Sequence, residues 1–560
     1  AVVDLGDSVP AFEQSLYKLG WSLFKQERYR EVLPVLFALL DRKIEQGKAY
    51  DAQVRELTPA DREQVADLLR VSSRSFANLG GVNAVQHYFT QNGSRSYEQQ
   101  IYLALAAWYV EQEQVSEATV TWLALAQADP LGAEAPRLMG KAIELNQEAG
   151  FQQRAVELET LFVQRYGNDS EFWTIHSPAD FAYVMQLLQS SLQDLARLAH
   201  AQANKTGDAN QASEAEQWYR RDLASFGGDP AAAEMNFQLA ELLYDNGQYR
   251  QALYEYERTA WSRQPHSRTV EAALGAQRAS GKALEQAGAA QTEELTERAT
   301  AGALRFVSSY PDHPAAPGLL AKSGTVLLKQ RQYNRALASS DDVVESAATP
   351  TALRQVAWSL RAQALFALQD YPAAAAAYSE ALQLAQKDDE RRPALQKGLA
   401  TATYNQAGQA LALGDPDSAV DLYQQAAALA PDTTMQAMAT FDAATTLLAL
   451  ESWPEAIALL ERFRDNFPDN PMQGEITQKL AYAYERSGAY AEAAVEYQHL
   501  GQDRRQPESL QREALLRALA LYTQTGATRK AIGAGEQYVE RFQEPAAIAV
   551  EVMQQLADLE

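Results

Sequence analysis

The chain has 560 residues with 73 acidic and 49 basic side chains, and its formal net charge of −24 would repel nucleic-acid phosphates, so no nucleic-acid partner is expected. The absence of cysteine excludes disulfides, thiolate metal sites and a cysteine nucleophile. The hydrophobic content of 46% is typical of a folded chain, yet no stretch approaches the roughly 18–20 apolar residues of a transmembrane segment.

Pairs of helices joined by short turns are predicted from the N-terminus onward. Residues 16–40 and 102–130 each show a first apolar helix with a small residue on its face, a turn and a second apolar helix. Residues 41–97 lack the small residue but still predict a helix, a Gly80-Gly81 turn and another helix. The N-terminal part therefore predicts helical hairpins of uneven regularity.

The middle of the chain fits this pattern less well. Residues 199–217 are polar and contain glycine and asparagine, which predicts a long surface turn. We expect a flexible joint near 165–180 or 200–215. Residues 265–310 predict a degenerate pair of helices.

The C-terminal part is the most regular. Residues 466–500 predict two helices joined by a turn at Gly488, where a positive φ angle costs glycine little. A small residue recurs on the second helix of successive hairpins at Ala419, Ala456 and Ala493, in steps of 37 residues. Such a fixed period predicts stacked copies of one unit.

This pattern resembles the tetratricopeptide-repeat family, which has a small residue midway along the first helix (helix A), glycine and tyrosine at the turn, and a small residue in the second helix (helix B), followed by an aromatic residue and a closing proline. The resemblance implies an all-α fold, a right-handed α-α superhelical solenoid of about a dozen helical hairpins, with a concave wall lined by helix A. We expect an N-terminal solenoid with a degenerate insert (1–175), an irregular segment with a long polar turn (176–310) and a regular array (311–560). Residues 545–560 are expected to form a single capping helix.

Two links between hairpins carry prolines at both ends, YPDHPAAP (310–317) and FPDNPMQG (467–474). They resemble links in bacterial envelope repeat proteins, such as the lipoprotein subunit of the outer-membrane β-barrel assembly machine and the Tol–Pal coordinator. This resemblance implies a periplasmic or outer-membrane-associated protein, although a cytoplasmic one also fits the sequence. The start, AVVDLGDSVPAFEQ, shows no uncleaved signal peptide and fits a mature or a trimmed N-terminus equally.

No motif predicts catalysis, a metal site or a cofactor, so we expect none of the three. No phosphate-binding or dinucleotide-binding glycine loop is present. The DPDSAVD segment (415–421) is interpreted as a helix cap and not a calcium loop, and Glu451 is placed in an inter-helix turn. The histidines, none at metal-ligand spacing, are expected at the surface or in turns: His87, His176, His200, His266, His313 and His499.

Candidate binding residues come from the positions of helix A that face inward in the family. An exposed aromatic side chain with polar neighbours suits contacts with a peptide backbone or a sugar. The alternative is that these aromatic residues pack on adjacent helices. The concave-face candidates are Trp21, Phe24, Lys25, Phe237, Glu241, Tyr244, Asp245, Gln363, Phe366, Gln478, Tyr482, Glu485 and Arg486.

Two function hypotheses follow. The first is a non-catalytic scaffold that binds one or more protein partners in its concave groove, within a bacterial cell-envelope assembly. The second is a polysaccharide export adaptor or the glycan-binding superhelical domain of a cell-wall protein. Self-association through the concave face or the terminal helices is a third hypothesis.

Overall fold

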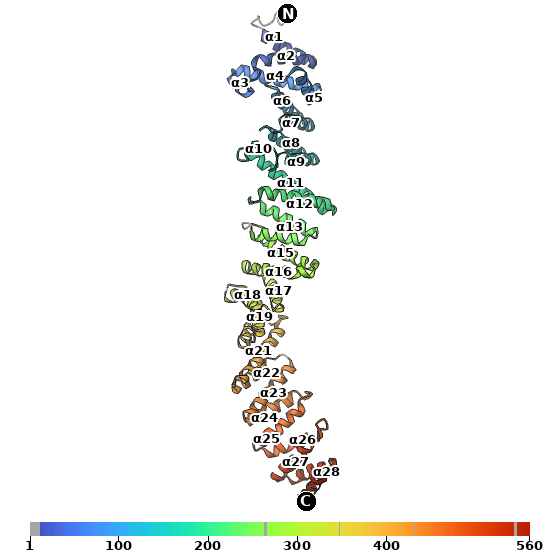
Figure 1. The fold of residues 1–560 in the computed structure, drawn as a ribbon, viewed down its shortest axis with the longest axis vertical. Helices are drawn as coiled ribbons and strands as arrows, with labels where there is room; N and C mark the ends of the chain where they lie inside the picture. The colour runs from blue at the N-terminus through green and yellow to red at the C-terminus, as the bar shows by residue number, and fades with distance from the viewer. Residues whose placement is uncertain (1–11, 263–265, 347, 431, 543–545, 560) are drawn as a thin grey trace. The chain divides into compact units, whose positions relative to one another are not determined.

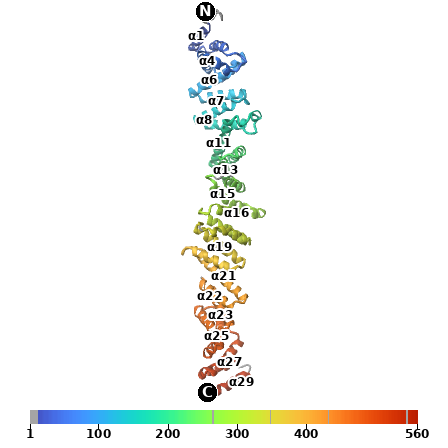
Figure 2. The same cartoon turned by 90° about the vertical axis from the view of Figure 1, so that its left-hand side faces the viewer.

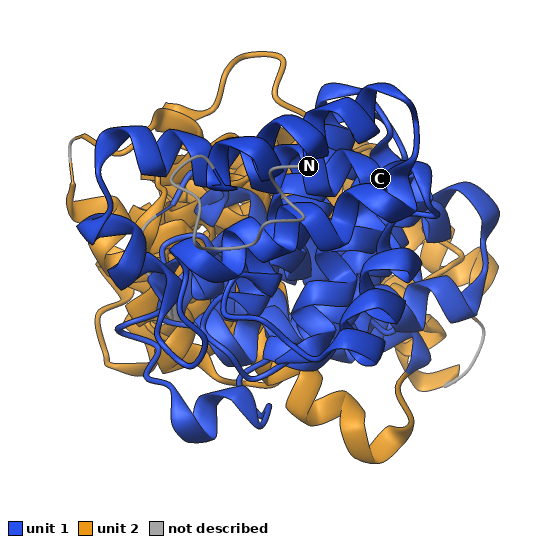
Figure 3. Cartoon of the chain, turned by 90° about the horizontal axis from the view of Figure 1, so that it is seen from above, with its two compact units in different colours: residues 1–286 blue, residues 287–560 orange. Residues whose placement is uncertain are grey.

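The structure is a computed structural model that describes residues 12–262, 266–346, 348–430, 432–542 and 546–559, and all regular elements in these ranges are helices. Figure 1 shows them in chain order, and Figure 2 shows them turned by 90°. The chain divides into two compact units, unit 1 (Ala1–Gln286) and unit 2 (Ala287–Glu560), coloured blue and orange in Figure 3. The predicted all-α fold is confirmed.

Unit 1 contains fifteen helices and one π-helical turn in its described residues. They are α1 (Phe12–Lys25), α2 (Tyr29–Lys43), α3 (Tyr50–Glu56), α4 (Pro59–Asn78), α5 (Val82–Asn92), α6 (Glu98–Glu111), α7 (Val115–Ala128), α8 (Ala135–Glu148), α9 (Gln152–Tyr166), α10 (Phe172–Ile175), α11 (Ala182–Thr206), α12 (Ala209–Phe226), α13 (Ala232–Asp245), α14 (Tyr249–Glu257), η2 (Arg258–Ser262) and α15 (Thr269–Gln286).

Unit 2 contains fourteen helices in its described residues. They are α16 (Ala289–Ser309), α17 (Ala316–Lys329), α18 (Tyr333–Glu345), α19 (Thr351–Ala367), α20 (Tyr371–Leu384), α21 (Arg392–Ala412), α22 (Pro416–Leu429), α23 (Thr433–Ala449), α24 (Trp453–Asn466), α25 (Gln473–Arg486), α26 (Tyr490–Gln502), α27 (Glu508–Gln524), α28 (Thr528–Arg541) and α29 (Ala546–Leu559).

Neighbouring helices pair into hairpins, and within each unit successive hairpins pack on one another. Within the described residues six such pairs lie in each unit, from α1–α2 to α13–α14 and from α17–α18 to α27–α28. In unit 2, α20 packs on α21, α22 on α23, α24 on α25 and α26 on α27. Since one hairpin cannot bury both of its apolar faces alone, this stacking supplies the core. The expected solenoid of about a dozen hairpins is confirmed.

Small residues allow neighbouring helices to approach one another, both within a hairpin and between successive hairpins. Ala419, Ala456 and Ala493, the three alanines spaced by 37 residues, are fully buried. On helix A of an earlier repeat, a Cβ atom added at Gly324 would lie 2.6 Å from the Leu360 Cδ1 atom of α19. The small residues that recur in the sequence therefore mark positions at which a larger side chain would prevent neighbouring helices from packing.

The turn between helices A and B places one residue in the left-handed region. Gly488 has φ of 84°, as predicted, and Glu451 occupies the corresponding turn with φ of 59°. The backbone amide of the next residue bonds back to the preceding helix in both turns, Ala489 to the Tyr484 carbonyl and Ser452 to the Leu447 carbonyl. The turn geometry is thus kept even where the sequence lacks glycine.

The long polar turn predicted at 199–217 is wrong. Helices α11 and α12 run through this segment and are joined at Gly207 and Asp208, whose carboxylate caps α12 by accepting from the Asn210 amide at 2.8 Å. Ala203 and Ala215 are buried, and the polar side chains between them lie largely on the exposed faces. The polar residues of this segment predicted a loop because of their composition, but they form the exposed faces of two amphipathic helices.

The prediction that every histidine lies at the surface or in a turn is wrong for His200. Its side chain is buried within α11, and its Nδ1 atom lies 3.1 Å from the Tyr219 hydroxyl of α12. Burial lowers the pKa of this imidazole, because the charged form loses its hydration. His200 is a buried residue of the α11–α12 hairpin.

The predicted joint near 165–180 contains α10, and the alternative position near 200–215 lies within the α11–α12 hairpin. Phe172 of α10 is fully buried and contacts Tyr166, His176 and Phe181, with ring centroids 4.3–5.3 Å apart. Aromatic packing therefore connects α9 to the segment before α11. Flexibility at 165–180 stays a prediction.

The remaining predicted segments can be compared with the described helices and with the boundary between the two units. Helices α4 and α5 lie within segment 41–97 and helices α15 and α16 within segment 265–310, where two helices each were expected, and α29 is the single terminal helix that was expected. The unit boundary at 286 and 287 lies within the predicted segment 176–310, and the three-segment division, which describes regularity of the pattern, stays a prediction. None of the described helices has the length and apolar content that crossing a membrane requires.

Candidate functional site

Three grooves in the described structure are lined mainly by A helices of neighbouring hairpins. The C-terminal groove lies between α23, α25 and α27, with a contribution from α26, and has a volume of about 840 Å³. The middle groove, of about 450 Å³, lies on α17, α19 and the start of α21, and the N-terminal groove, of about 710 Å³, lies on α1 and α4. Because hairpins stack in register, alternate helices face the same side and leave these hollows between them.

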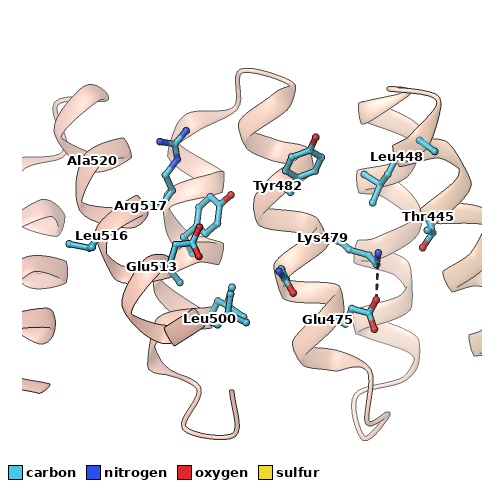
Figure 4. Close-up of a pocket in the computed structure, with 15 residues that line it drawn as sticks. Thr445, Leu448, Glu475, Lys479, Tyr482, Leu500, Glu513, Leu516, Arg517 and Ala520 are labelled. Carbon is cyan, nitrogen blue, oxygen red and sulfur yellow. Dashed lines mark ion pairs between the residues drawn. The ribbon is translucent and has the colours of Figure 1, made fainter. Parts of the chain in front are cut away.

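The C-terminal groove combines apolar and polar side chains (Figure 4). Leu448 of α23 and Leu516 of α27 supply apolar walls, and Tyr482 of α25 is 48% exposed between them. The Tyr482 ring meets Trp453 edge-on, with centroids 5.8 Å apart. An exposed aromatic ring held by a second ring offers a contact surface that loses little side-chain entropy on binding.

The charged residues of this groove are largely paired. The Lys479 ammonium lies 3.5 Å from the Glu475 carboxylate, and Arg517 forms an ion pair with Glu485. Glu485 also accepts a hydrogen bond from the Tyr497 hydroxyl at 2.9 Å. Glu513 is exposed and has no ion pair or hydrogen bond within the described residues. Burial and then the nearby Glu513 carboxylate raise the pKa of Tyr497, so its hydroxyl stays a donor at neutral pH.

The four candidates at the C-terminal end differ in availability. Gln478 and Tyr482 line the groove and are exposed. Glu485 is partly buried, and its carboxylate is already bonded to the Tyr497 hydroxyl and the Arg517 guanidinium. It therefore holds these two groove-lining side chains in place. Arg486 is exposed; its guanidinium lies 5.7 Å from the Trp453 ring centroid, beside the groove.

The two middle candidates divide in the same way. Gln363 lines the middle groove and is exposed, with its amide donating to the Ser359 carbonyl at 3.2 Å. Phe366 is partly buried and packs edge-on against Tyr371, with ring centroids 5.2 Å apart. Phe366 therefore fits the alternative expectation, in which an aromatic candidate packs on an adjacent helix.

The N-terminal candidates surround one end of the N-terminal groove. Trp21 lines this groove and donates from its indole nitrogen to the Asp67 carboxylate at 3.0 Å. Phe24 packs against the rings of Trp21 and Tyr29, and Lys25 is exposed at the last position of α1. Only Trp21 of these three lines the groove.

The prediction that Phe237 is an exposed concave-face residue is wrong. It is 3% exposed, because it packs against the Tyr256 ring and beneath the Arg268 guanidinium. Its apolar side chain fills the space between α13 and the helices that follow.

The other three candidates on α13 do not line any of the three grooves. Glu241 accepts a hydrogen bond from the Tyr256 hydroxyl, and Tyr244 packs edge-on against Tyr249. Asp245 is exposed at the end of the helix. The candidates Gln478, Tyr482, Gln363 and Trp21 are therefore the ones that line grooves.

Sequence reasoning missed the contribution of α27. Glu513 and Arg517 lie 35 residues after Gln478 and Tyr482, and all four line the C-terminal groove. Extending the inward helix A positions by one repeat would have found them. The C-terminal hairpin has a weaker signature, because Thr528 follows the turn glycine Gly526 where Tyr490 follows Gly488.

Glu159 is a buried carboxyl group outside these grooves. Burial, with the Asp194 charge adding to it, raises the pKa of Glu159 to about 7. Such a shift often marks a functional group, but here the carboxyl accepts from the Gln147 amide at 2.6 Å between α8 and α9. Among the described residues no group of three or more His, Asp or Glu side chains could hold a metal ion.

Comparisons with known proteins agree with the repeat pattern. Residues 322–389 and 410–480 each match the family described as tetratricopeptide repeat, and the second match includes the α23 wall of the C-terminal groove and the part of α25 up to residue 480. No curated protein matches the chain. Among solved structures it is similar to the crystal structure of the P58(IPK) TPR domain, with 16% identity over 76% of this chain and 99% of that chain and a TM-score of 0.20, which is too low to support an argument. The similarity to tetratricopeptide repeats therefore covers these two segments.

Proposed function

We propose that this chain is a non-catalytic scaffold whose A-helix grooves bind extended segments of protein partners. Tetratricopeptide repeats indicate protein–protein interaction, and no enzyme family is indicated by the comparisons. The observation that carries the proposal is the C-terminal groove, in which Tyr482 of α25 stands exposed between apolar side chains of the A helices on either side. A buried aromatic anchor surrounded by apolar walls is the usual energetic centre of a protein interface.

Substitution of Tyr482 by alanine tests the proposal. The ring is exposed, so its loss should leave the fold intact while removing about 1–3 kcal/mol of binding free energy, a factor of about 5–150 in affinity. The measurement is recovery of stoichiometric partners from the native host with the immobilised full chain, followed by mass spectrometry. The matched control is Tyr254→Ala, because Tyr254 is also exposed but lies on α14, a B helix outside the three grooves. Partners retained by the Tyr482 variant, or lost equally from both variants, would contradict the proposal.

We also propose a place for this scaffold in a bacterial cell-envelope assembly, periplasmic or associated with the outer membrane. The support is the form of the two proline-bounded links. In one of them the Asn470 side chain accepts from the Met472 amide at 2.9 Å, within the link directly before α25. Fractionation of the native host with an antibody against the chain tests this location, and recovery in the cytoplasmic fraction alone would contradict it.

A glycan partner is the second candidate function, as a polysaccharide export adaptor or a glycan-binding domain of a cell-wall protein. It is favoured by the exposed Tyr482 ring beside Trp453, because sugars stack on exposed aromatic faces. Binding of purified cell-wall glycan that is lost in Tyr482→Ala and kept in Tyr254→Ala would support it. Absence of glycan binding by the unaltered chain would remove it.

A further inference from the structure

In a typical anion-binding surface the cationic side chains have no acidic partner, whereas the cationic side chains that line the A-helix grooves are paired with carboxylates. In the C-terminal groove both lining cations, Lys479 and Arg517, are neutralised by carboxylates of α25. A cation already paired with a carboxylate attracts an incoming anion less strongly, because its charge is largely neutralised. These two residues are therefore poorly placed to recruit an acidic ligand.

The groups left available in the C-terminal groove are an anion, an amide and an aromatic ring. Glu513 has no cationic partner within the described residues, and Gln478 and Tyr482 are exposed beside it on the neighbouring A helix. Figure 4 shows Glu513 on the helix that also carries Leu516 and Arg517, facing the helix of Tyr482. The unpaired charge of the groove is thus negative.

The N-terminal groove shows the same arrangement independently. Its lining cation, Arg70, is paired with Asp67, which also accepts from the Tyr17 hydroxyl at 2.6 Å. Asp61 is paired with Lys43 at 2.7 Å. Glu63 is exposed and has no partner within the described part of the chain. Two grooves in different units therefore leave one glutamate each unpaired.

We propose that the C-terminal groove binds an extended basic peptide segment of a protein partner. A lysine or arginine of the segment pairs with Glu513, and an apolar side chain two positions away packs on Tyr482. Side chains of an extended segment alternate in direction, so one face supplies both contacts while the backbone lies against Gln478. The net charge of −24 adds long-range attraction for a basic segment. This inference rests on the proposed function, because it assigns the chemistry of the segment that the scaffold binds.

The test begins with peptides selected from a random library. Twelve-residue peptides displayed on phage are selected on the full chain, and the recovered sequences are compared with the unselected library. We expect enrichment of lysine and arginine at one position and of an aliphatic or aromatic residue two positions away. A recovered peptide is then synthesised with a fluorescent label and titrated by polarisation against the chain and its variants.

The variants separate the charge from the groove. Glu513→Gln keeps the shape of the side chain and removes its charge, and we expect it to weaken binding about 2- to 5-fold, as for an exposed ion pair, whereas Glu513→Lys should weaken it further. The control is Glu492→Gln, which removes the same charge from an exposed position of the B helix α26 outside the groove and should change affinity less than 2-fold. The weakening should also shrink as salt rises, because an exposed ion pair is screened.

The outcomes distinguish this inference from the proposed function. Selected peptides that are acidic or neutral, or that bind Glu513→Gln as tightly as the unaltered chain, overturn the basic-segment inference; if they still depend on Tyr482, the groove function stands. Selection of no peptide, or of peptides that bind Tyr482→Ala unchanged, overturns both. Binding that is weakened by Glu513→Gln and by Tyr482→Ala but not by Glu492→Gln supports both.

Discussion

At the scale of single residues, the turn glycine shows how one backbone angle sustains a hairpin. Gly488 has φ of 84° and no atom within 4 Å of an added Cβ, so alanine there would meet conformational strain and no clash. Gly488→Ala should lower the free energy of unfolding by about 1–2 kcal/mol, because L-residues disfavour the left-handed region. Urea unfolding followed by circular dichroism measures it.

The matched control for that substitution is Gly533→Ala in the same unit. Gly533 lies within helix α28 at an ordinary helical φ, and an added Cβ would again meet nothing within 4 Å. Alanine should stabilise here by up to about 1 kcal/mol through helix propensity. Equal effects of the two substitutions would contradict the backbone explanation.

Glu159 makes the stability of its hairpin depend on pH. Its pKa is raised from 4.5 to about 7 in the folded chain, so the folded state holds a proton that the unfolded state releases. The stability from this group is fully present below pH 4.5 and is lost as pH rises through about 7. Glu159→Gln should remove this dependence and stabilise the α8–α9 hairpin at pH 8 by roughly 2 kcal/mol.

Hydrogen exchange of α8 and α9 at pH 5.5 and 8 measures that effect. The control is Glu157→Gln two residues away, since Glu157 is exposed and paired with Arg154 at 2.7 Å. Slower exchange of the hairpin at pH 8 in the Glu159 variant alone is the expected result. An unchanged pH profile would show that this carboxyl is not the cause.

At the scale of elements, the short helix α10 joins α9 to α11 through one buried ring. Phe172→Ala should cost about 3–5 kcal/mol, because Phe172 is fully buried among aromatic neighbours. Repeats couple mainly to their neighbours, so hydrogen exchange should accelerate in α9 and α11 and stay unchanged in α1 and α2. Acceleration throughout unit 1 would contradict this local coupling, and Phe151→Ala at an exposed ring serves as the control.

The regular hairpins could be predicted from the sequence because their signals are steric. Buried Ala456 and Ala493 and the left-handed turn at Gly488 leave fixed residue types at fixed spacing. The α11–α12 hairpin was missed because its buried alanines are separated by polar residues that resemble a loop in composition. Phe237 was misplaced because a helix position shared with the family does not show how closely the next helix packs against it.

The groove could be predicted only in part. The inward positions of helix A follow from the repeat, which gave Tyr482 and Gln478. Which charges are paired depends on distances between side chains of successive repeats, such as Arg517 and Glu485, which are 32 residues apart. That information lies in the packing, and the unpaired state of Glu513 emerges only from the structure.

At the scale of the whole molecule, core packing and partner binding use different surfaces of each hairpin. Stacked hairpins bury their apolar faces against one another, and the surface formed by the A helices contains the grooves that bind a partner. In the described residues these grooves lie on both units, so each unit can be tested by itself.

Site-specific photocrosslinking in the native host tests this claim most directly. A benzophenone side chain is placed in turn at Gln478 and Tyr482 in the C-terminal groove, and at Tyr254 and Glu492 on exposed B-helix surfaces. The account predicts that the groove positions crosslink to the same protein partner and that the B-helix positions do not. Crosslinks to that partner from the B-helix positions alone would contradict it.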